Sequence, residues 1–397
     1  MRPTTSTAVV GAGVVGLVTA WRLRLAGHAV TVIDPAPASE ATYAAAGMLA
    51  PISEVQYGQE TLWPIMTAAQ REYPQLIESL SRATDAPTGY CENGTLQVAA
   101  DASDRNAAAD LVDVQRAAGM TVEPLTSSAL RRREPSLAPG LAKAWDVPSD
   151  HQVDPRILAA AITTALNTDL TARHRAAGPP VTWVRRRVIG VEEQPDGDQR
   201  PIAITTDDGQ QRHFDRTALV PGMGYSDIAG IPQQNPLPLR EVHGDVLRLR
   251  VRPEQLMTGE PHLLGATVRA KVAGRSVYLV PREDGGLVIG ASSREDGLVG
   301  THVGSVAELL EDAIRVLPAV REMELVEITS RARPATPDDR PYLGHPGRQS
   351  AVVVSTGFHR HGVLLAPLAA RLTTALLSDE ELNETDHDVL ASLSPSR

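Results

Sequence analysis

Residues 8–34 read AVVGAGVVGLVTAWRLRLAGHAVTVID, and this stretch decides the fold. A short apolar run leads into the turn Gly11-Ala12-Gly13-Val14-Val15-Gly16, a helix-like stretch follows, and a second apolar run stops at Asp34. The turn glycines let the backbone approach a pyrophosphate, and the helix N-terminus offers it N–H groups and the positive end of a dipole. An acid about twenty residues on can accept hydrogen bonds from a ribose diol. The order strand, turn, helix, strand and acid therefore predicts a dinucleotide site.

Size, charge and cysteine content narrow the class of protein. The chain has 397 residues, two or three domain-sized units at about 150 residues each. Its net charge is 38 − 48 = −10, and nucleic acids and anionic membranes bind basic surfaces, so we expect neither as a partner. Cys91 is the only cysteine, which excludes an intrachain disulfide and favours a cytoplasmic location. No apolar run reaches the roughly 18 residues of a membrane span, and no cluster has metal-ligand spacing, so we expect no metal.

Helical and strand-like patterns alternate along the chain. The first segment of the chain has alternating helical and strand-like patterns, and it is followed by a mixed segment, a second alternating segment, a strand-rich segment and a third alternating segment. This order suggests a nucleotide-binding domain interrupted twice by a second domain. We also expect a polar hairpin turn at Gly197 and a frayed tail after residue 379. Hydrophobic spacing predicts helices over 14–26, 61–83, 104–119, 156–167, 305–316 and 363–377, and strands over 93–99, 181–193, 201–206, 218–220, 245–251, 277–280, 287–291, 322–329 and 351–355.

The C-terminal segment bears on which dinucleotide is bound. A buried-type strand, 351–355, runs into Gly357 and Gly362 and then into a helix. In a flavoenzyme, a second helix N-terminus at this place can stabilise the anionic reduced flavin. The same pattern fits one more strand–helix unit of a large sheet. On these residues alone both interpretations stay open.

The whole chain resembles the amino-acid oxidase superfamily of FAD enzymes, and within it the glycine oxidases of thiamine biosynthesis. The stretches that carry the resemblance occur in family order and span nearly the whole chain. They are GAGVVG at 11–16 with Asp34, AAAGMLAP at 44–51, DHQVDPRILAAA at 150–161, VYLVPREDGGLVIGAS at 277–292, RARPATPDDRPYLG at 331–344 and TGFHRHGVLLAP at 356–367.

The resemblance implies an α/β fold in which a Rossmann-type FAD-binding domain is interrupted by a smaller α+β substrate-binding domain with an antiparallel sheet. The expected FAD-binding parts are 1–85, 146–235 and 326–397, and the substrate-binding parts are 86–145 and 236–325. The implied reaction oxidises glycine or an N-substituted glycine to the imine by hydride transfer to flavin N5. Oxygen then yields H2O2, and the imine hydrolyses to glyoxylate and an amine or ammonia. FAD is expected to be noncovalent, because this chain lacks a cysteine after Cys91.

The resemblance also implies roles for residues around the substrate. Arg333 matches the arginine that pairs bidentately with the substrate carboxylate, which suits a planar guanidinium. Tyr278 matches the tyrosine whose hydroxyl reaches the same carboxylate. Arg360 matches an arginine on the flavin and amine side, and Met48 matches a residue of the pocket wall. Ser293 stands where a bulkier pocket residue is familiar.

The expected FAD contacts form three groups: the glycine turn and its acid, the small residues along the flavin edge, and the start of the last helix. No catalytic base is required, because orientation and electrostatics suffice once the carboxylate is held. His359 and His361 are therefore interpreted as loop histidines near the cofactor. The predicted cofactor residues are Gly11, Gly13, Val14, Val15, Gly16, Asp34, Thr42, Ala45, Ala46, Gly47, Met48, Val188 (through its backbone), Gly222, Arg333, Gly357, His359, Arg360, His361, Gly362, Val363 and Leu364.

The chain departs from the family pattern around the amine. Residues 357–362 read GFHRHG where glycine oxidases tend to Gly-His-Phe/Tyr-Arg-Asn-Gly, Ser276 stands where a histidine can occur, and 221–226 read PGMGYS in place of Ala-Gly-Ala-Trp-Ser. A roomier or more polar pocket could take an N-substituted glycine or another amino acid. Alternatives are a D-amino-acid or secondary-amine dehydrogenase or oxidase, an NAD-dependent dehydrogenase and a non-catalytic flavin-binding subunit. Expected partners are an amine bearing a carboxylate, O2 and a possible second copy of the chain.

Overall fold

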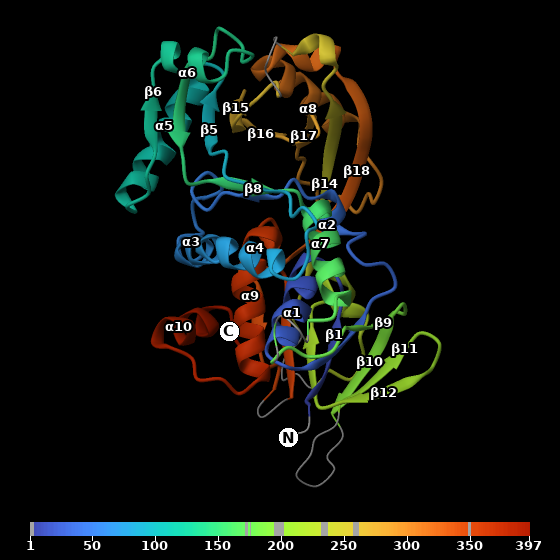
Figure 1. Cartoon of the computed structure of the whole chain (residues 1–397). Helices are drawn as coiled ribbons and strands as arrows, with labels where there is room; N and C mark the ends of the chain where they lie inside the picture. Colours follow the sequence, from blue (N-terminus) through green and yellow to red (C-terminus); the bar gives the residue numbers. More distant parts are fainter. Residues whose placement is uncertain are drawn as a thin grey trace.

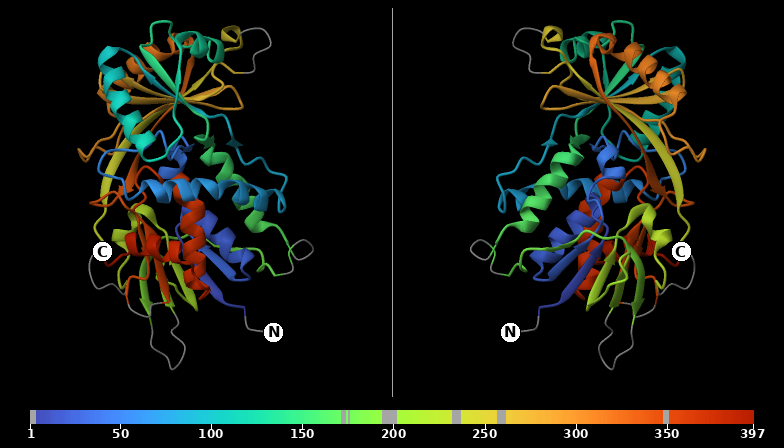
Figure 2. Two further views of the ribbon diagram at one scale, coloured as in Figure 1. Left: turned by 90° about the vertical axis from the view of Figure 1, so that its left-hand side faces the viewer. Right: turned by 90° about the vertical axis from the view of Figure 1, so that its right-hand side faces the viewer.

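The computed structural model describes residues 4–170, 174, 176–193, 202–231, 237–256, 262–347 and 351–397. Two sheets dominate it: a six-stranded sheet in the lower half of Figure 1 and an eight-stranded sheet in the upper half. Short strands and helices lie between them, as the turned views of Figure 2 also show. The expected α/β class, with a second antiparallel sheet, is confirmed. The turn expected at Gly197 lies outside the described residues.

The six-stranded sheet carries the glycine turn. Its order is β19-β20-β13-β1-β2-β9, with all neighbours parallel except β19 and β20. Alternate residues face opposite ways, so one face packs on helices and the other on a small antiparallel sheet. The strands are β1 (Ser6–Val10), β2 (Ala29–Ile33), β9 (Thr182–Val184), β13 (Arg216–Leu219), β19 (Tyr342–Gly344) and β20 (Val352–Thr356); the helices are α1 (Val14–Leu25), α7 (Pro155–Asn167) and α9 (Gly362–Leu377); the small sheet is β10 (Val188–Glu193), β11 (Ile202–Thr206) and β12 (Gln211–Phe214).

The eight-stranded sheet has the order β18-β14-β17-β16-β15-β5-β7-β6 and is antiparallel except between β15 and β5. Helix α8 (Val303–Val316) packs with α6 (Ser127–Arg133) on one apolar face. The other face presents Val246, Val280 and Val288 toward Ala46. The strands are β5 (Thr95–Ala99), β6 (Glu123–Leu125), β7 (Lys143–Val147), β14 (Arg240–Arg250), β15 (Thr267–Val272), β16 (Arg275–Pro281), β17 (Gly286–Gly290) and β18 (Glu324–Ala335), and α5 (Ala102–Ala117) packs at the β5 and β7 end.

Strand β18 is longer than the sequence pattern predicted. The strand expected over 322–329 runs on to Ala335, so Arg333 lies on a strand rather than in a Pro-rich loop. Each residue of β14 from Arg240 to Arg250 is paired with a residue of β18, with one register shift between Arg248 and Leu249. The extension of β18 to Ala335 is therefore part of the ladder. The sequence-derived boundary at 326 falls inside this strand, and we propose to move it to the end of β18.

The layer between the sheets contains short elements. These are α2 (Ala41–Ala44), α3 (Trp63–Arg71), α4 (Tyr73–Ser81) and the strands β3 (Met48–Leu49), β8 (His151–Val153) and β4 (Tyr90–Cys91). The single helix predicted over 61–83 was wrong, because α3 and α4 meet at Glu72. Pro74 explains the break, since proline suits the first turn of a helix and lacks the N–H that a continuous helix needs.

The C-terminal tail is ordered, contrary to the expected fraying. Helix α10 (Glu384–Ser392) begins after Asn383, whose side chain accepts the Asp386 N–H. Leu393 is buried and its carbonyl accepts the N–H of Leu343 at 2.8 Å. The buried side chain of Leu393 helps to anchor this otherwise polar tail. Among the helices of the described residues, none has the length and apolar character of a membrane span.

Candidate active site

A cavity of about 460 Å³ opens between the two sheets. The walls come from the start of α1, the 41–48 segment, the strands β14, β15, β16 and β18, the segment 291–294 after β17, and the start of α9. Of the residues predicted from the sequence, those that line it are Val14, Thr42, Ala45, Ala46, Gly47, Met48, Tyr278, Ser293, Arg333, His359, Arg360, His361, Gly362, Val363 and Leu364.

The glycine turn is built so that only glycine fits. Gly11 has a φ of +97°, and a Cβ there would collide with the carbonyl of Val220 at the end of β13. A Cβ on Gly16 would collide with the carbonyl of Gly11, so the helix lies directly against the turn. Gly13 is the N-cap of α1 and brings no capping side chain. The N-terminus of α1 thus reaches the cavity with no side chain on its N-cap, which suits the close approach of a pyrophosphate.

Asp34 ties the turn to the end of β2. Its carboxylate accepts the N–H of Ala12 and that of Ala36, both at 2.7 Å. An ionised carboxylate has about four lone-pair sites, so acceptor capacity remains for a ribose. The carboxylate therefore fits the ribose end of FAD and also fixes the turn, a role the sequence pattern did not indicate.

The 41–48 segment lies along the cavity and is held by arginines. The Thr42 hydroxyl accepts the Val14 N–H at 2.9 Å, which ties the segment to α1. Arg248 donates to the carbonyls of Tyr43 and Ala45, and Arg282 donates to the carbonyl of Ala46 at 2.6 Å. These contacts explain why a strongly apolar loop keeps one conformation. The sequence offered no signal for either arginine, because the contacts join distant parts of the chain.

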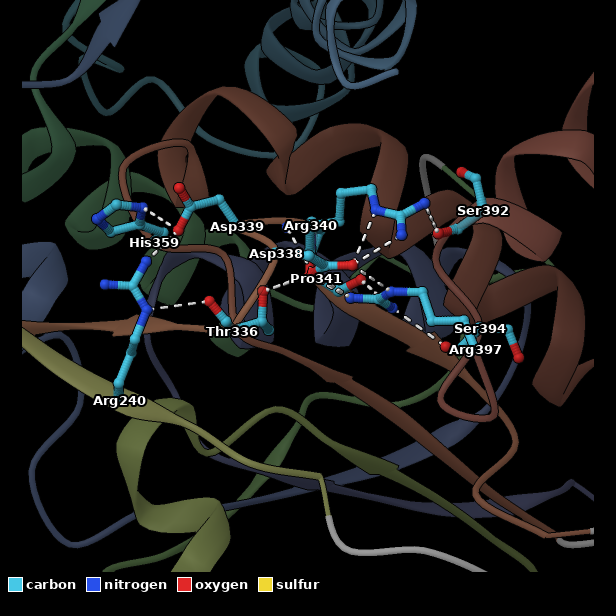
Figure 3. A network of polar contacts seen from close by, with 10 residues as sticks. All are labelled: Arg240, Thr336, Asp338, Asp339, Arg340, Pro341, His359, Ser392, Ser394 and Arg397. Atoms are coloured by element: carbon cyan, nitrogen blue, oxygen red, sulfur yellow. Dashed lines mark hydrogen bonds and ion pairs between the residues drawn. The ribbon is translucent and has the colours of Figure 1, made fainter. Parts of the chain in front are cut away.

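The start of α9 supplies the opposite wall. His359, with a φ of +48°, places Nδ1 3.2 Å from Asp339 Oδ1, and Arg240 also pairs with Asp339 (Figure 3). Burial, opposed by Asp339 and reinforced by Arg333, lowers the pKa of His359 to about 4. The imidazole is therefore neutral near pH 7. A histidine with so low a pKa is a weak proton acceptor, which agrees with a structural role.

Arg333 and Tyr278 converge on the floor of the cavity. The Arg333 guanidinium lies over Gly244, where a Cβ would collide with it, and one N–H donates to the Ser292 carbonyl at 3.2 Å. The Tyr278 phenol lies over Gly290, its cross-strand partner. The two side chains thus lean toward each other across β14 and β17. A guanidinium has five N–H donors, which leaves a fork for a carboxylate.

A buried carboxylate that the sequence reasoning missed lies beside this floor. Glu54 is 5 % exposed and pairs with Arg360 at 2.8 Å and with Arg269 of β15. Burial, reinforced by Arg360, lowers the pKa of Arg269 to about 9. The available signal was that Glu54 is the only acid in the apolar stretch 44–55.

Some predicted residues do not line the cavity. Val188 is buried in β10 within the core behind the six-stranded sheet, and Gly222, with a φ of +59°, accepts the Thr356 hydroxyl through its carbonyl. Val15 and Gly357 also lie outside the lining, and their cofactor roles stay predictions. Within the described residues, His, Cys, Asp and Glu form no group of three that could hold a metal ion.

Known proteins resemble the chain over its full length. It is 28 % identical to the bifunctional protein ThiO/ThiG of Synechocystis sp., covering 100 % of this chain and 54 % of that protein. The glycine oxidase of Pseudomonas aeruginosa is 27 % identical, with 94 % of both chains covered. The crystal structure of glycine oxidase from Geobacillus kaustophilus matches with a TM-score of 0.82 and 28 % identity over 99 % of each chain. This chain spans about half the length of the first curated relatives it matches.

A family model described as FAD dependent oxidoreductase matches residues 6–376. The match covers both sheets and every wall of the cavity. It confirms the predicted cofactor and favours FAD over NAD, and the glycine turn and Asp34 fit the pyrophosphate and ribose of that cofactor. The chain therefore belongs to the FAD dependent oxidoreductase family.

Proposed function

We propose that the protein is an FAD-dependent oxidase of glycine or an N-substituted glycine, producing an imine and H2O2. One observation carries this proposal: Arg333 and Tyr278 converge over two glycines, on the floor of a cavity that also reaches the N-termini of α1 and α9. A guanidinium fork beside a phenol suits one carboxylate. The names of the relatives, glycine oxidase and ThiO/ThiG, support the same chemistry and a place in thiamine biosynthesis.

In this proposal the residues bind and orient the substrate. Arg333 donates to the carboxylate and Tyr278 adds its hydroxyl, which together fix the Cα–H direction. Arg269, Arg333 and Arg360 outnumber Glu54 around the cavity, so a bound ammonium loses its proton easily and the amine is neutral. FAD, when bound, supplies the acceptor for the hydride and returns the electrons to O2. Water then hydrolyses the imine to glyoxylate and an amine or ammonia.

The test uses the purified, flavin-loaded protein without air. Glycine, sarcosine, N-ethylglycine and D-alanine are each mixed with it, and the loss of flavin absorbance is followed. We expect glycine or an N-alkylglycine to reduce the flavin fastest. Admission of air should then restore the absorbance of the oxidised flavin, with one H2O2 formed for each flavin reoxidised. Fastest reduction by D-alanine would favour the D-amino-acid alternative, and reduction without peroxide formation would favour a dehydrogenase. No reduction by any of the four would favour a non-catalytic subunit. A cytoplasmic location and a second copy of the chain stay predictions.

A further inference from the structure

Helix α9 contains a proline in its second turn, close to the wall of the cavity. Pro367 lacks the N–H that the carbonyl of Val363, four residues earlier, would accept in a regular helix, and its ring crowds that carbonyl. The hydroxyl of Tyr73 donates to the Val363 carbonyl at 2.5 Å instead. Tyr73 is the first residue of α4 and is fully buried. A side chain from a distant segment thus replaces the missing helical hydrogen bond.

Further contacts hold the start of α4 against α9. Glu72, directly before Tyr73, accepts a hydrogen bond at 2.8 Å from Arg371, which lies about two turns beyond Val363 on α9. The ring of Tyr73 also stacks on that of Tyr90, with ring centres 6.1 Å apart. Burial raises the pKa of Tyr73, and Tyr90 adds to this effect, so the hydroxyl keeps its proton and remains a donor.

The carbonyl of Val363 and the N–H of Leu364 belong to one peptide group. Because this group is planar and its C=O and N–H point in opposite directions, a hydrogen bond to the carbonyl also fixes the direction of the N–H. In a helix this N–H points toward the N-terminus, and Gly362, Val363 and Leu364 line the cavity there. His361, at the N-cap, makes no capping hydrogen bond, and within the described residues the Leu364 N–H has no acceptor. It is therefore available to a ligand in the cavity.

We infer that Tyr73 is a positioning residue for bound FAD. By donating to the Val363 carbonyl, it polarises the peptide group and holds the Leu364 N–H toward the cavity, where this N–H and the α9 dipole favour a negatively charged ligand. Because reduction makes the flavin anionic, this contact stabilises reduced FAD more than oxidised FAD and raises the reduction potential of the bound cofactor. Tyr73 does not line the cavity, so it acts through α9. The inference requires bound FAD but not the proposed substrate.

The first test removes the hydroxyl and keeps the ring. The midpoint potential of the flavin in Tyr73→Phe is measured by equilibration with a reference dye during slow anaerobic reduction, which needs no amine substrate. The preference of the protein for reduced over oxidised FAD should fall by about tenfold, which lowers the potential by about 30 mV for a two-electron couple. A potential equal to that of the wild type would overturn the inference.

The second test restores the helical hydrogen bond. Pro367→Ala supplies an N–H four residues after Val363, so the carbonyl no longer depends on the hydroxyl of Tyr73. The double variant Tyr73→Phe/Pro367→Ala should therefore have the same flavin potential as Pro367→Ala alone. A lower potential in the double variant would overturn the inference, because a backbone N–H does not repair a general loosening of the core. This comparison remains decisive even if Tyr73→Phe alone does not fold.

The matched control is Tyr90→Phe. Tyr90 stacks on Tyr73, but its hydroxyl donates to Glu92 at 3.0 Å and not to α9. The same chemical change should leave the flavin potential at the wild-type value, and a shift equal to that of Tyr73→Phe would overturn the inference.

Failure of this inference and failure of the proposed function give different results. If no amine reduces the flavin but the potentials differ as expected, the proposed function fails and the role of Tyr73 stands. If glycine reduces the flavin but Tyr73→Phe has the wild-type potential, only the role of Tyr73 fails.

Discussion

Gly290 lies beneath the phenol of Tyr278, its partner across the β16–β17 pair, so that a Cβ at 290 would collide with the hydroxyl. The same relationship holds between Gly244 and the guanidinium of Arg333. Both side chains can lie along the floor only because the sheet has no side chain there. The proposed carboxylate position thus depends on these two glycines as well as on the two side chains above them.

Replacing Gly290 tests this dependence. Gly290→Ala should lift the phenol from the floor and lower kcat/KM for glycine by about tenfold or more, since a small misplacement of an orienting group is costly. The flavin should remain bound, because 290 is not among the predicted cofactor residues. Gly140→Ala is the control, as a Cβ there meets no atom within 4 Å. Equal kinetics in both variants would show that Tyr278 does not orient the substrate.

Asp150 should make the stability of the fold depend on pH. Its buried carboxylate accepts the N–H groups of Ile52 and Ser53, the residues before Glu54, and burial raises its pKa to about 7. The unfolded chain has a pKa of about 3.9, so between pH 4 and 7 the native state binds more protons. The free energy of unfolding therefore falls as the pH rises through this window.

Asp150→Asn removes this titration. In urea unfolding, the wild type should lose stability relative to Asp150→Asn between pH 5 and pH 8. The exposed Asp113 on α5 supplies the control variant, Asp113→Asn, which should track the wild type. A constant difference between wild type and Asp150→Asn across this range would contradict the assignment. The substitution should also disturb Glu54, because it weakens the support of the preceding backbone.

Arg397 should hold the C-terminus to the turn that follows β18 (Figure 3). It donates to both oxygens of Asp338 at 3.1 Å and to the Pro341 carbonyl at 3.0 Å, and it lies 4.4 Å from the Tyr342 ring centre. Arg397→Ala should lower the free energy of unfolding by about 1–2 kcal/mol at pH 7.

The effect of Arg397→Ala should shrink in acid. Burial acts to raise the pKa of Asp338, but hydrogen bonds from Arg397 and Arg340 lower it overall. A carboxylate whose pKa is lower in the folded than in the unfolded chain stabilises the fold above about pH 4, where it is ionised in both states. This contribution is lost as the pH falls below that value. Thermal unfolding at pH 7 and at pH 3 measures the difference in stability between the wild type and Arg397→Ala at each pH. An undiminished difference at pH 3 would show that the ion pair does not contribute.

Local patterns predicted the elements well where one segment determines its own structure. The structure has the predicted turn and helix α1, with Asp34 directly after β2, because consecutive residues determine this geometry. The roles of these residues in binding FAD stay predictions. The extent of β18 was missed because its pairing partner, β14, lies far away in the sequence. The break between α3 and α4 was missed although Pro74 marks it. The buried ion pair between Glu54 and Arg269 could not be predicted, since these residues meet only in the folded chain.

Removal of the Arg333 side chain tests the central claim most directly. Arg333→Ala should stay yellow, with its flavin spectrum unchanged, because the proposed FAD contacts at Gly11, Gly16 and Asp34 lie elsewhere. Anaerobic reduction by glycine should slow by at least about a hundredfold, as the loss of a buried bidentate pair implies. Reduction of Arg333→Ala at the wild-type rate by glycine and N-ethylglycine would contradict the account.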